Sequence, residues 1–324
     1  MTLNRHQFEQ AAKHFRAGRL TLSDFANQLF PKPDEAVEEN AHSDPKPNAD
    51  AATVKLPPRK RDAHKGDFGR VLVIGGSRTM PGAIGLTALA ALRAGSGLVV
   101  VATPHDAATV VAGYSPCYVT EGHDSSEALA QLQDRLEWAD VIAIGPGMGQ
   151  DPAKISFVTQ LYKTAPQPIV VDADAINCLA ASKVDLKEHE GQRILTPHLG
   201  EFRRLIGAPI TDRDKAEQSA TQFAADNRLV MLLKGAGTFV TDGQSTARNK
   251  TGNPGMATGG SGDVLTGMIA SLIGQGLTPL EAAKSAAHLH GHAGDLAAAK
   301  LGQASLISSD LLDFLPAAIF ANQT

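Results

Sequence analysis

Short apolar runs alternate with amphipathic segments along the chain from about residue 70 onward. The apolar runs are rich in Val, Ile, Leu and Ala, which is typical of strands buried on both faces of a sheet. The segments between them repeat apolar residues every three or four positions, which is typical of helices. The apolar runs lie at 70–75, 98–102, 141–144, 169–172, 193–196 and 230–234. The helical segments lie at 83–92, 125–137, 152–163, 198–206 and 212–226.

This alternation predicts an α/β fold. A strand followed by a helix and another buried strand is typical of a mostly parallel central sheet with helices on both faces and right-handed crossovers. After the run at 230–234, the residues 238–241 and the turn signal Asp242-Gly243 predict a hairpin at one side of the sheet.

The C-terminal part is predicted to be helical. Thr278 to Glu281 read T-P-L-E, a capping box with proline at the first helical position, and the helix that they begin should reach about Lys300. Ser308 or Ser309 is the predicted cap of a last helix.

The N-terminal part has a different pattern. Residues 3–30 place apolar side chains at spacings near three and four, which predicts one or two short amphipathic helices, whereas 31–58 are rich in Pro, Asp, Glu, Asn and Ala, which predicts a disordered linker. We therefore expect an N-terminal extension over 1–60 and one α/β domain over 61–322. A plain extension is the favoured interpretation of 1–60, ahead of a docking element.

Composition narrows the class of protein. With 324 residues and 43% hydrophobic residues, the chain can bury a substantial core. A net charge of −4 argues against nucleic acid as a partner. Its 2 cysteines offer neither a disulfide framework nor a metal-ligand spacing. The sequence contains no signal-peptide pattern and no long apolar run, so we expect a soluble cytoplasmic protein without a membrane partner.

A glycine-rich loop at 252–262 leads directly into an apolar helix and carries the most informative chemistry. Glycines let a backbone approach a ligand closely, and a helix N-terminus offers unpaired N–H groups to an anion. Asp263 lies where the loop meets the helix, so it is either a first-turn charge stabilised by the helix dipole or a general base beside an anion site. A P-loop is excluded because Asp263 and Val264, not Lys and Ser or Thr, follow Gly262.

Other polar residues follow the predicted strands, where ligands bind in open α/β sheets. The glycines of 145–149 indicate either close ligand approach or an ordinary turn. Asp172 and Asp174 could hold a metal through water or cap the next helix; we favour capping for Asp174 and contact with Mg²⁺ or phosphate for Asp172. His288 and His292 have a zinc-like spacing without a third ligand, so we favour a packing role in or near a subunit contact.

Two strand ends are compatible with nucleotide chemistry. Lys234 and the glycines after it could neutralise phosphate and bring backbone N–H groups close to it, or they could be the solvated entry to the hairpin. Thr196 to Glu201 read T-P-H-L-G-E, where His198 could be structural and Glu201 a first-turn charge.

The stretch 253–267, N-P-G-M-A-T-G-G-S-G-D-V-L-T-G, resembles the anion-hole and catalytic-aspartate motif of ribokinase-like kinases, and in its full length that of the ADP-dependent NAD(P)H-hydrate dehydratases. T-P-H-L-G-E is similar to the T-P-H-x-G-E motif of the same family. The resemblance covers roughly 60–320. It implies a ribokinase-like fold and dehydration of NADHX or NADPHX, the hydrates of NADH and NADPH, with ADP as phosphoryl donor and AMP and phosphate as coproducts.

The resemblance also implies roles for individual residues. Asp263 would be the catalytic base and would also contact the hydrate, together with Ala83, Gly147, Gly149 and His198. Glu201 would organise the Mg²⁺ shell through water. The nucleotide would bind the residues Lys234, Gly235, Ala236, Gly237, Thr238, Asn253, Gly260, Ser261 and Gly262.

The same resemblance implies Mg²⁺ as cofactor, a homotetramer and a separate NAD(P)HX epimerase. The epimerase would be on another chain, because the segment before Lys65 is too short for that domain. The alternative is a kinase of the same fold that acts on a thiazole or pyrimidine alcohol, and His198 in place of Asn argues against it. A nucleotide sensor without activity would be expected to lack Asp263 or the glycines. Neither the preference for ADP over ATP nor that for NADHX over NADPHX can be read from the residues.

Overall fold

The computed structural model describes residue 56 and residues 58–322, all within one compact unit, Ala52–Thr324. The helices expected in 3–30 and nearly all of the expected linker lie outside the described residues.

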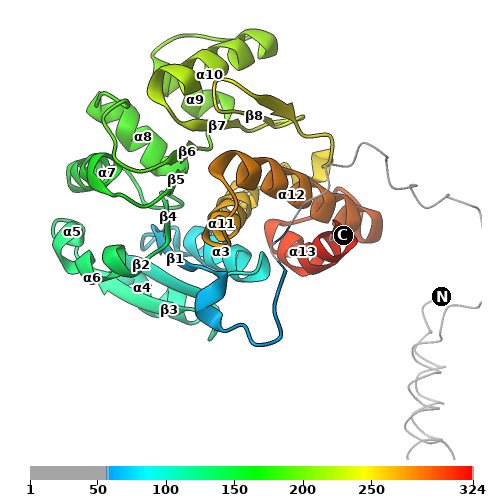
Figure 1. Ribbon diagram of the computed structural model, residues 1–324, viewed down its shortest axis with the longest axis horizontal. Helices are drawn as coiled ribbons and strands as arrows, with labels where there is room; N and C mark the ends of the chain where they lie inside the picture. The colour runs from blue at the N-terminus through cyan, green and yellow to red at the C-terminus, as the bar shows by residue number, and fades with distance from the viewer. Residues whose placement is uncertain (1–55, 57, 323–324) are drawn as a thin grey trace, which may run out of the picture. The chain divides into compact units, whose positions relative to one another are not determined.

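The described residues form a 9-stranded sheet in the order β3-β2-β1-β4-β5-β6-β7-β8-β9 (Figure 1). In this spatial order, each strand from β3 at one edge to β7 pairs in parallel with the next. Strand β8 then pairs antiparallel with β7, and β9 pairs antiparallel with β8. The register places Val71 opposite Val99 and Ala143 opposite Val170. The strands are β1 (Arg70–Ile74), β2 (Leu98–Pro104), β3 (Val119–His123), β4 (Val141–Ile144), β5 (Ile169–Val171), β6 (Arg193–Leu195), β7 (Val230–Leu233), β8 (Phe239–Thr241) and β9 (Thr246–Arg248).

Helices cover both faces of the sheet because successive strand residues face opposite sides. Val71 and Val73 of β1 pack in one core with α3, α4, α11, α12 and α13, whereas Leu72 and Ile74 pack in the other with α5, α7, α8, α9 and α10. The helices are α3 (Pro81–Arg93), α4 (His105–Ala112), α5 (Ala128–Gln131), α6 (Gln133–Trp138), α7 (Pro152–Thr164), α8 (Ala173–Ser182), α9 (Leu199–Ile206), α10 (Arg213–Asn227), α11 (Ser261–Gly274), α12 (Pro279–Leu301) and α13 (Ser308–Asn322), with short 3₁₀ turns η1 (Lys65–Phe68) and η2 (Pro254–Met256).

The sequence predictions of the fold are confirmed, with informative differences. The hairpin forms from β8 and β9, and Thr278 caps α12 with a reciprocal bond to Glu281. The pattern did not indicate β3 or α4: β3 reads V-T-E-G-H at the edge of the sheet, where one exposed face makes polar residues tolerable. The helix expected over 125–137 is two short helices, α5 and α6.

Helix α11 is the central helix of its layer and lies directly against α3 (Figure 1). Every residue from Val264 to Ile273 is buried. Gly267 makes the close approach possible, because a Cβ at this position would lie 2.0 Å from the carbonyl oxygen of Thr87 in α3. The position of α11 is thereby fixed, and with it the position of its first turn.

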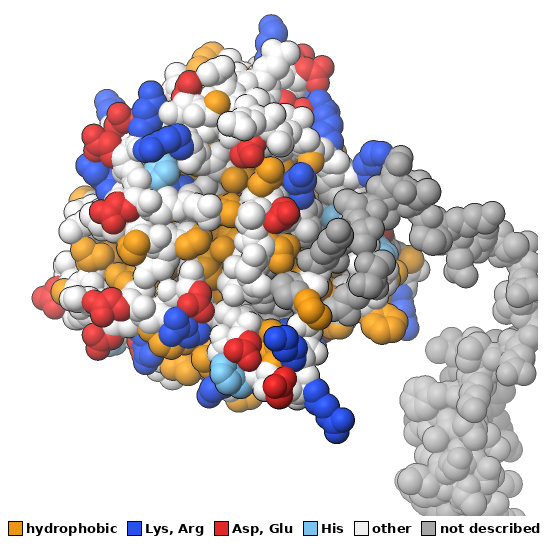
Figure 2. Space-filling view, in the orientation of Figure 1, with side chains coloured by type: hydrophobic (Ala, Val, Ile, Leu, Met, Phe, Trp, Pro, Cys, Tyr) orange, Lys and Arg blue, Asp and Glu red, His pale blue; other side chains and the backbone are white. Residues whose placement is uncertain are grey.

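The surface carries charges of both signs. On the face in Figure 2, Lys and Arg side chains are interspersed with Asp and Glu, and hydrophobic side chains appear between the elements in the middle. Within the described part of the chain, none of the helices combines the length and the apolar character needed to cross a membrane.

Candidate active site

A fully buried carboxylate, Asp172, joins four elements at the carboxyl edge of the sheet. It follows β5 and accepts hydrogen bonds from Lys234 Nζ at 2.7 Å, Thr196 Oγ1 at 2.8 Å and Thr266 Oγ1 at 2.7 Å. These donors follow β7, follow β6 and belong to α11, respectively. A buried charge is tolerated only when it is paired and hydrogen-bonded, as it is here. Asp172 is buried and these three donors occupy its carboxylate, so its expected contact with Mg²⁺ or phosphate stays a prediction.

Lys234 lies between this carboxylate and the glycine loop. Its Nζ is 4.0 Å from Glu201 Oε2 and 3.1 Å from where a Cβ on Gly262 would lie. Burial lowers the pKa of Lys234, but the charges of Asp172 and Glu201 raise it by more, so the pKa is raised overall and the ammonium group stays charged. A fixed positive charge therefore faces the first turn of α11.

Asp263 lies in that first turn. Burial and, second to it, the negative charge of Asp172 raise the pKa of Asp263 to about 7, against the opposing charge of Lys234. A carboxylate with this pKa exists in both protonation states near neutral pH, which suits a group that must accept and release a proton. Burial of the site and the nearby charge of Asp172 therefore give Asp263 the pKa of a candidate general base.

The glycine loop presents the N-terminus of α11 without a side-chain cap. Gly260 is the N-cap residue, with φ +94°, and a Cβ there would lie 2.6 Å from Leu86 Cδ1. Ser308 Oγ donates to the Gly259 carbonyl at 2.6 Å and holds the loop in place. The first-turn N–H groups of α11 are therefore available to an anion beside Lys234 and Asp263.

His290 of α12 supports the same turn, a role that the sequence pattern did not indicate. Its Nε2 hydrogen-bonds to the Ser261 carbonyl at 2.9 Å, and burial lowers the pKa of His290 to about 4, so the ring is neutral. The sequence also gave little indication of the hydroxyls of Thr196 and Thr266, which donate to Asp172. The only signal for Thr196 and Thr266 was a hydroxyl within an otherwise apolar stretch, which needs a buried partner.

His198 and Glu201 form a reciprocal capping box at the start of α9. The Glu201 N–H donates to His198 Nδ1 at 3.1 Å, and the His198 N–H donates to Glu201 Oε2 at 2.8 Å. The ring of His198 remains 54% exposed at its side chain, so it can still meet a ligand. The backbone of His198 also pairs by a parallel bridge with that of Lys234, so the two residues lie side by side at the edge of the sheet.

The glycine turn after β4 brings Ala83 to the same edge. Gly147 has φ +65°, and a Cβ there would lie 3.0 Å from Ala83 Cβ. Gly149 donates its N–H to Asp174 Oδ2 at 2.8 Å. The carboxylate of Asp174 therefore fixes this turn, and the expectation that it caps α8 is wrong.

The residues expected to bind nucleotide lie in two places. The turn 235–237 is exposed, and Arg213 holds it by donating to the carbonyls of Lys234 and Gly237, each at 3.3 Å. Thr238 Oγ1 donates to the Gly235 carbonyl at 3.1 Å. Ala236 lies at the tip of this turn. The side chain of Asn253, in contrast, is used in local structure, where it accepts from the Gly255 N–H and donates to Asp295 of α12.

The described residues do not show a zinc site. Asn322 hydrogen-bonds to His288 and to His292, so both rings have a partner in α13, and the subunit contact expected near them stays a prediction. No cluster of three or more His, Cys, Asp or Glu among the described residues could hold a metal by itself. Glu201 and Asp263 do supply carboxylate oxygens next to the anion site. Such oxygens are the ligands that Mg²⁺ takes when substrate phosphates and water complete its shell.

Comparisons with known proteins identify the family of this chain. The family model described as NAD(P)H-hydrate dehydratase matches residues 71–317. The bifunctional NAD(P)H-hydrate repair enzyme Nnr of Moorella thermoacetica is 48% identical over 81% of this chain and 51% of its own length. The chain thus spans about half the length of the curated relatives it matches.

Solved structures agree with the family model. The ADP/ATP-dependent NAD(P)H-hydrate dehydratase of Bacillus subtilis, co-crystallised with ATP and Mg²⁺, has a TM-score of 0.75 and 33% identity over 83% of this chain and 95% of its own. A hydroxyethylthiazole kinase of Pyrococcus horikoshii shares the fold, with a TM-score of 0.57 and 18% identity over 77% of this chain and 88% of its own. The described sheet with helices on both faces is therefore ribokinase-like, and the chain belongs to the NAD(P)H-hydrate dehydratase family.

Proposed function

We propose that this domain dehydrates the (6S)-hydrate of NADH or NADPH, uses ADP as the phosphoryl donor, and releases NAD(P)H, AMP and phosphate. The observation that carries the proposal is the juxtaposition of Asp263, with a pKa of about 7, and the Lys234 ammonium group at the uncapped start of α11. A base, a fixed cation and an anion site at one point are what transfer of a phosphoryl group to a hydroxyl requires.

The chemistry follows from a poor leaving group. The hydrated ring carries a hydroxyl, and hydroxide leaves poorly. Asp263 would take the hydroxyl proton while the hydroxyl oxygen attacks the terminal phosphorus of ADP and AMP leaves. The ring nitrogen's lone pair would then expel phosphate, which restores the reduced nicotinamide. The N–H groups of Gly260–Gly262 and Lys234 would stabilise the negative charge on the transferring group.

The two ligands would occupy opposite sides of Asp263. Ala83, Gly147, Gly149 and His198 would contact the hydrate, since the turn after β4 and the start of α9 lie at the same sheet edge. The nucleotide would lie along 234–238 and 260–262. Because Asn253 is engaged with Gly255 and Asp295, we propose that it shapes the loop for the nucleotide through these bonds.

Magnesium fits this donor set. Glu201 is 5% exposed and faces Lys234, so it would act on a hydrated ion through water, while Asp263 and the nucleotide would supply oxygens nearer to it. A bound Mg²⁺ would neutralise charge on the diphosphate. The homotetramer and the separate epimerase stay predictions, which light scattering and a search for epimerase activity in a partner chain would test.

The test is a coupled assay with freshly prepared hydrate. Incubation with Mg²⁺ and either ADP or ATP should restore absorbance at 340 nm and produce one nucleotide product for each NAD(P)H, and Asp263→Asn should not. A kinase of the same fold would instead leave the absorbance unchanged and convert a thiazole or pyrimidine alcohol to a stable phosphate ester. Formation of such a phosphate ester, with no turnover of either hydrate, would overturn the proposal.

A further inference from the structure

The glycine loop before α11 needs contacts outside itself to keep one conformation. Residues 252–262 include the glycines Gly252, Gly255, Gly259, Gly260 and Gly262. Glycine loses more conformational freedom on ordering than any other residue, so neighbouring elements must fix a loop of this kind. The N–H groups of its last residues serve the proposed anion site only while the loop is held in place.

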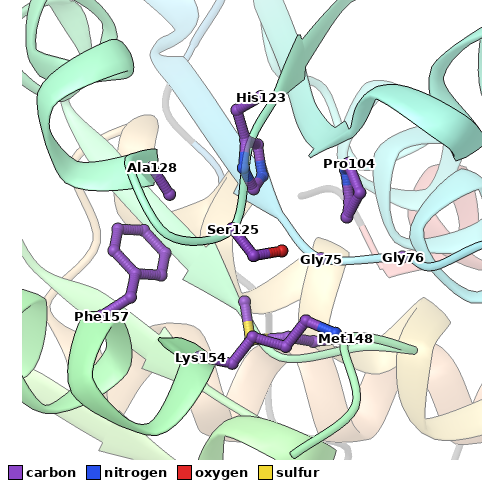
Figure 3. Close-up of a pocket in the computed structure, with 9 residues that line it drawn as sticks. All are labelled: Gly75, Gly76, Pro104, His123, Ser125, Ala128, Met148, Lys154 and Phe157. Carbon is purple, nitrogen blue, oxygen red and sulfur yellow. The ribbon is translucent and has the colours of Figure 1, made fainter. Parts of the chain in front are cut away.

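A small pocket in the β1–β4 half of the sheet edge does not offer a second anion site. It lies at the carboxyl ends of these strands and is lined by Met148, Phe157 and Pro104, among others (Figure 3). It has room for about one water molecule, so a phosphate group does not fit. Binding of nucleotide phosphates therefore depends on the loop before α11.

Helix α12 forms the surface on which the first half of this loop lies. A Cβ on Gly291 of α12 would lie 2.2 Å from Thr251 Oγ1, and a Cβ on Gly294 would lie 2.2 Å from Met256 Sδ. Thr251 Oγ1 also donates to the His288 carbonyl at 2.8 Å. Thr251 and Met256 therefore pack directly on the backbone of α12, where any side chain larger than that of glycine would displace them.

Asp295, the next residue of α12, binds the loop through both carboxylate oxygens. Its Oδ2 accepts from the Gly252 N–H at 2.9 Å, and its Oδ1 accepts from Asn253 Nδ2 at 3.0 Å. Hydrogen bonds to a carboxylate are stronger than those between neutral groups. One side chain of α12 thus fixes the backbone at 252 and the side chain at 253.

The bond to Asp295 also decides which way the amide of Asn253 faces. A carboxylate only accepts hydrogen bonds, so the NH₂ end of the amide faces Asp295. The carbonyl end then accepts from the Gly255 N–H at 3.0 Å, and this bond caps the turn η2, from which the chain continues to Gly260 and α11. A donor in place of the carboxylate would turn the amide round and leave the Gly255 N–H without its partner.

The other end of the loop has its own anchors. His290 of α12 hydrogen-bonds to the Ser261 carbonyl at 2.9 Å, and Ser308 of α13 donates to the Gly259 carbonyl at 2.6 Å. Without Asp295, the loop would keep this second end but lose the hydrogen bonds that hold its start to α12. Ordering the released residues would then reduce the free energy available for nucleotide binding.

We propose that Asp295 is a positioning residue for the nucleotide: through Gly252 and Asn253 it holds the glycine loop in the conformation that binds phosphate. The inference rests on the proposed function, because it needs the anion site at α11. Asp295 acts through the loop and not by touching the ligand. If only a fraction of the molecules has the competent loop, the apparent ADP affinity falls by that fraction.

The experiment exchanges the two side chains and measures ADP binding by calorimetry with Mg²⁺. Asp295→Asn replaces two acceptors with one acceptor and one donor, so it should weaken ADP binding by roughly 10-fold to 100-fold, the fold equivalent of one hydrogen bond to a charged group. Asn253→Asp places two carboxylates face to face and should weaken binding at least as much. In the double variant, the amide at 295 accepts from the Gly252 N–H and donates to the carboxylate at 253, which accepts from the Gly255 N–H. All three bonds return, so most of the ADP affinity should return.

Steady-state kinetics separate positioning from general destabilisation. Each single variant should raise KM for ADP and lower kcat, because the same N–H groups stabilise the transferring phosphoryl group, and KM for the hydrate should not change. A loss of folding would instead reduce the amount of active enzyme and leave both KM values as they are. Asp313→Asn, on the exposed side of α13, removes the same charge and is the matched control.

Three results would overturn the inference. Unchanged ADP affinity in folded Asp295→Asn protein would show that the anchor is not needed. A double variant no better than the single variants would show that Asn253 touches the nucleotide itself. Rapid hydrogen exchange at the Gly252 and Gly255 N–H groups of the unliganded wild-type protein would show that the anchor does not form, and this measurement does not depend on any variant folding. In each case turnover of the hydrate by the wild-type protein would leave the proposed function standing, whereas absence of any turnover would remove both.

Discussion

Replacing Asp263 with Asn should make the protein more stable and almost inactive. The neutral amide has nearly the shape of the carboxylate but does not ionise. In the wild-type protein burial raises the pKa of Asp263 from 3.8 to about 7, so the folded state resists the loss of this proton while the unfolded chain releases it readily. The free energy of unfolding therefore falls over the pH range in which Asp263 ionises in the unfolded chain but stays protonated in the folded protein.

The size of the effect follows from the shift. Each pKa unit corresponds to about 1.4 kcal/mol, so a shift of about three units removes about 4 kcal/mol of stability once the pH exceeds 7. The sign is that of an acid whose pKa is raised on folding: stability is full below about pH 4, falls as the pH rises towards 7, and is constant above it. Asp263→Asn should escape this loss, which for a domain of this size is roughly 8–16 °C in Tm at pH 8.

The assay is unfolding of both proteins without nucleotide, Mg²⁺ or substrate, at pH 5 and pH 8. The variant's advantage should grow by about 2–3 kcal/mol between the two pH values. In the coupled assay the same variant should lose about 10²–10⁴ in rate, and wild-type kcat/KM should fall about tenfold for each pH unit below 7. Asp226→Asn, on the exposed side of α10, is the matched control and should change neither property.

Two results would contradict this reasoning. Parallel pH dependences of unfolding in the two proteins would show that Asp263 is not desolvated in the folded state. Near-normal turnover by Asp263→Asn would show that another group takes the proton.

Three further changes test the surroundings of Asp263. Lys234→Met should weaken ADP binding and destabilise the protein by about 3–5 kcal/mol, because it leaves the buried Asp172 charge unpaired; adding Asp172→Asn should restore stability in denaturant titrations but not the ADP affinity. His198→Asn should raise KM for the hydrate with little change in Tm, since Asn also caps helices well; a change confined to KM for ADP would place His198 on the nucleotide side. Gly267→Ala places a Cβ 2.0 Å from the Thr87 carbonyl and should cost about 1–3 kcal/mol in thermal unfolding, and an unchanged Tm would mean that α11 and α3 can separate without loss.

The sequence by itself determined the parallel strands, the hairpin and the loop that ends at Asp263. These features are local: a buried strand, a turn signal and a glycine-rich helix start are each written in a few consecutive residues, so periodicity and residue type were sufficient. The family followed from the same stretch, because residues 253–267 form one uninterrupted motif. The edge strand β3 was missed because its exposed face carries polar residues and the apolar pattern disappears.

Only the tertiary structure decided which polar groups meet. Asp172 lies 62 residues from Lys234 and 94 from Thr266, and the order of the strands alone brings these three together. Asp174 was expected to cap its own helix, yet it binds Gly149 because the turn after β4 adjoins the end of β5. The pKa of Asp263 likewise depends on the groups that lie around it. Burial and charge act through space, so they become known only once the chain has folded.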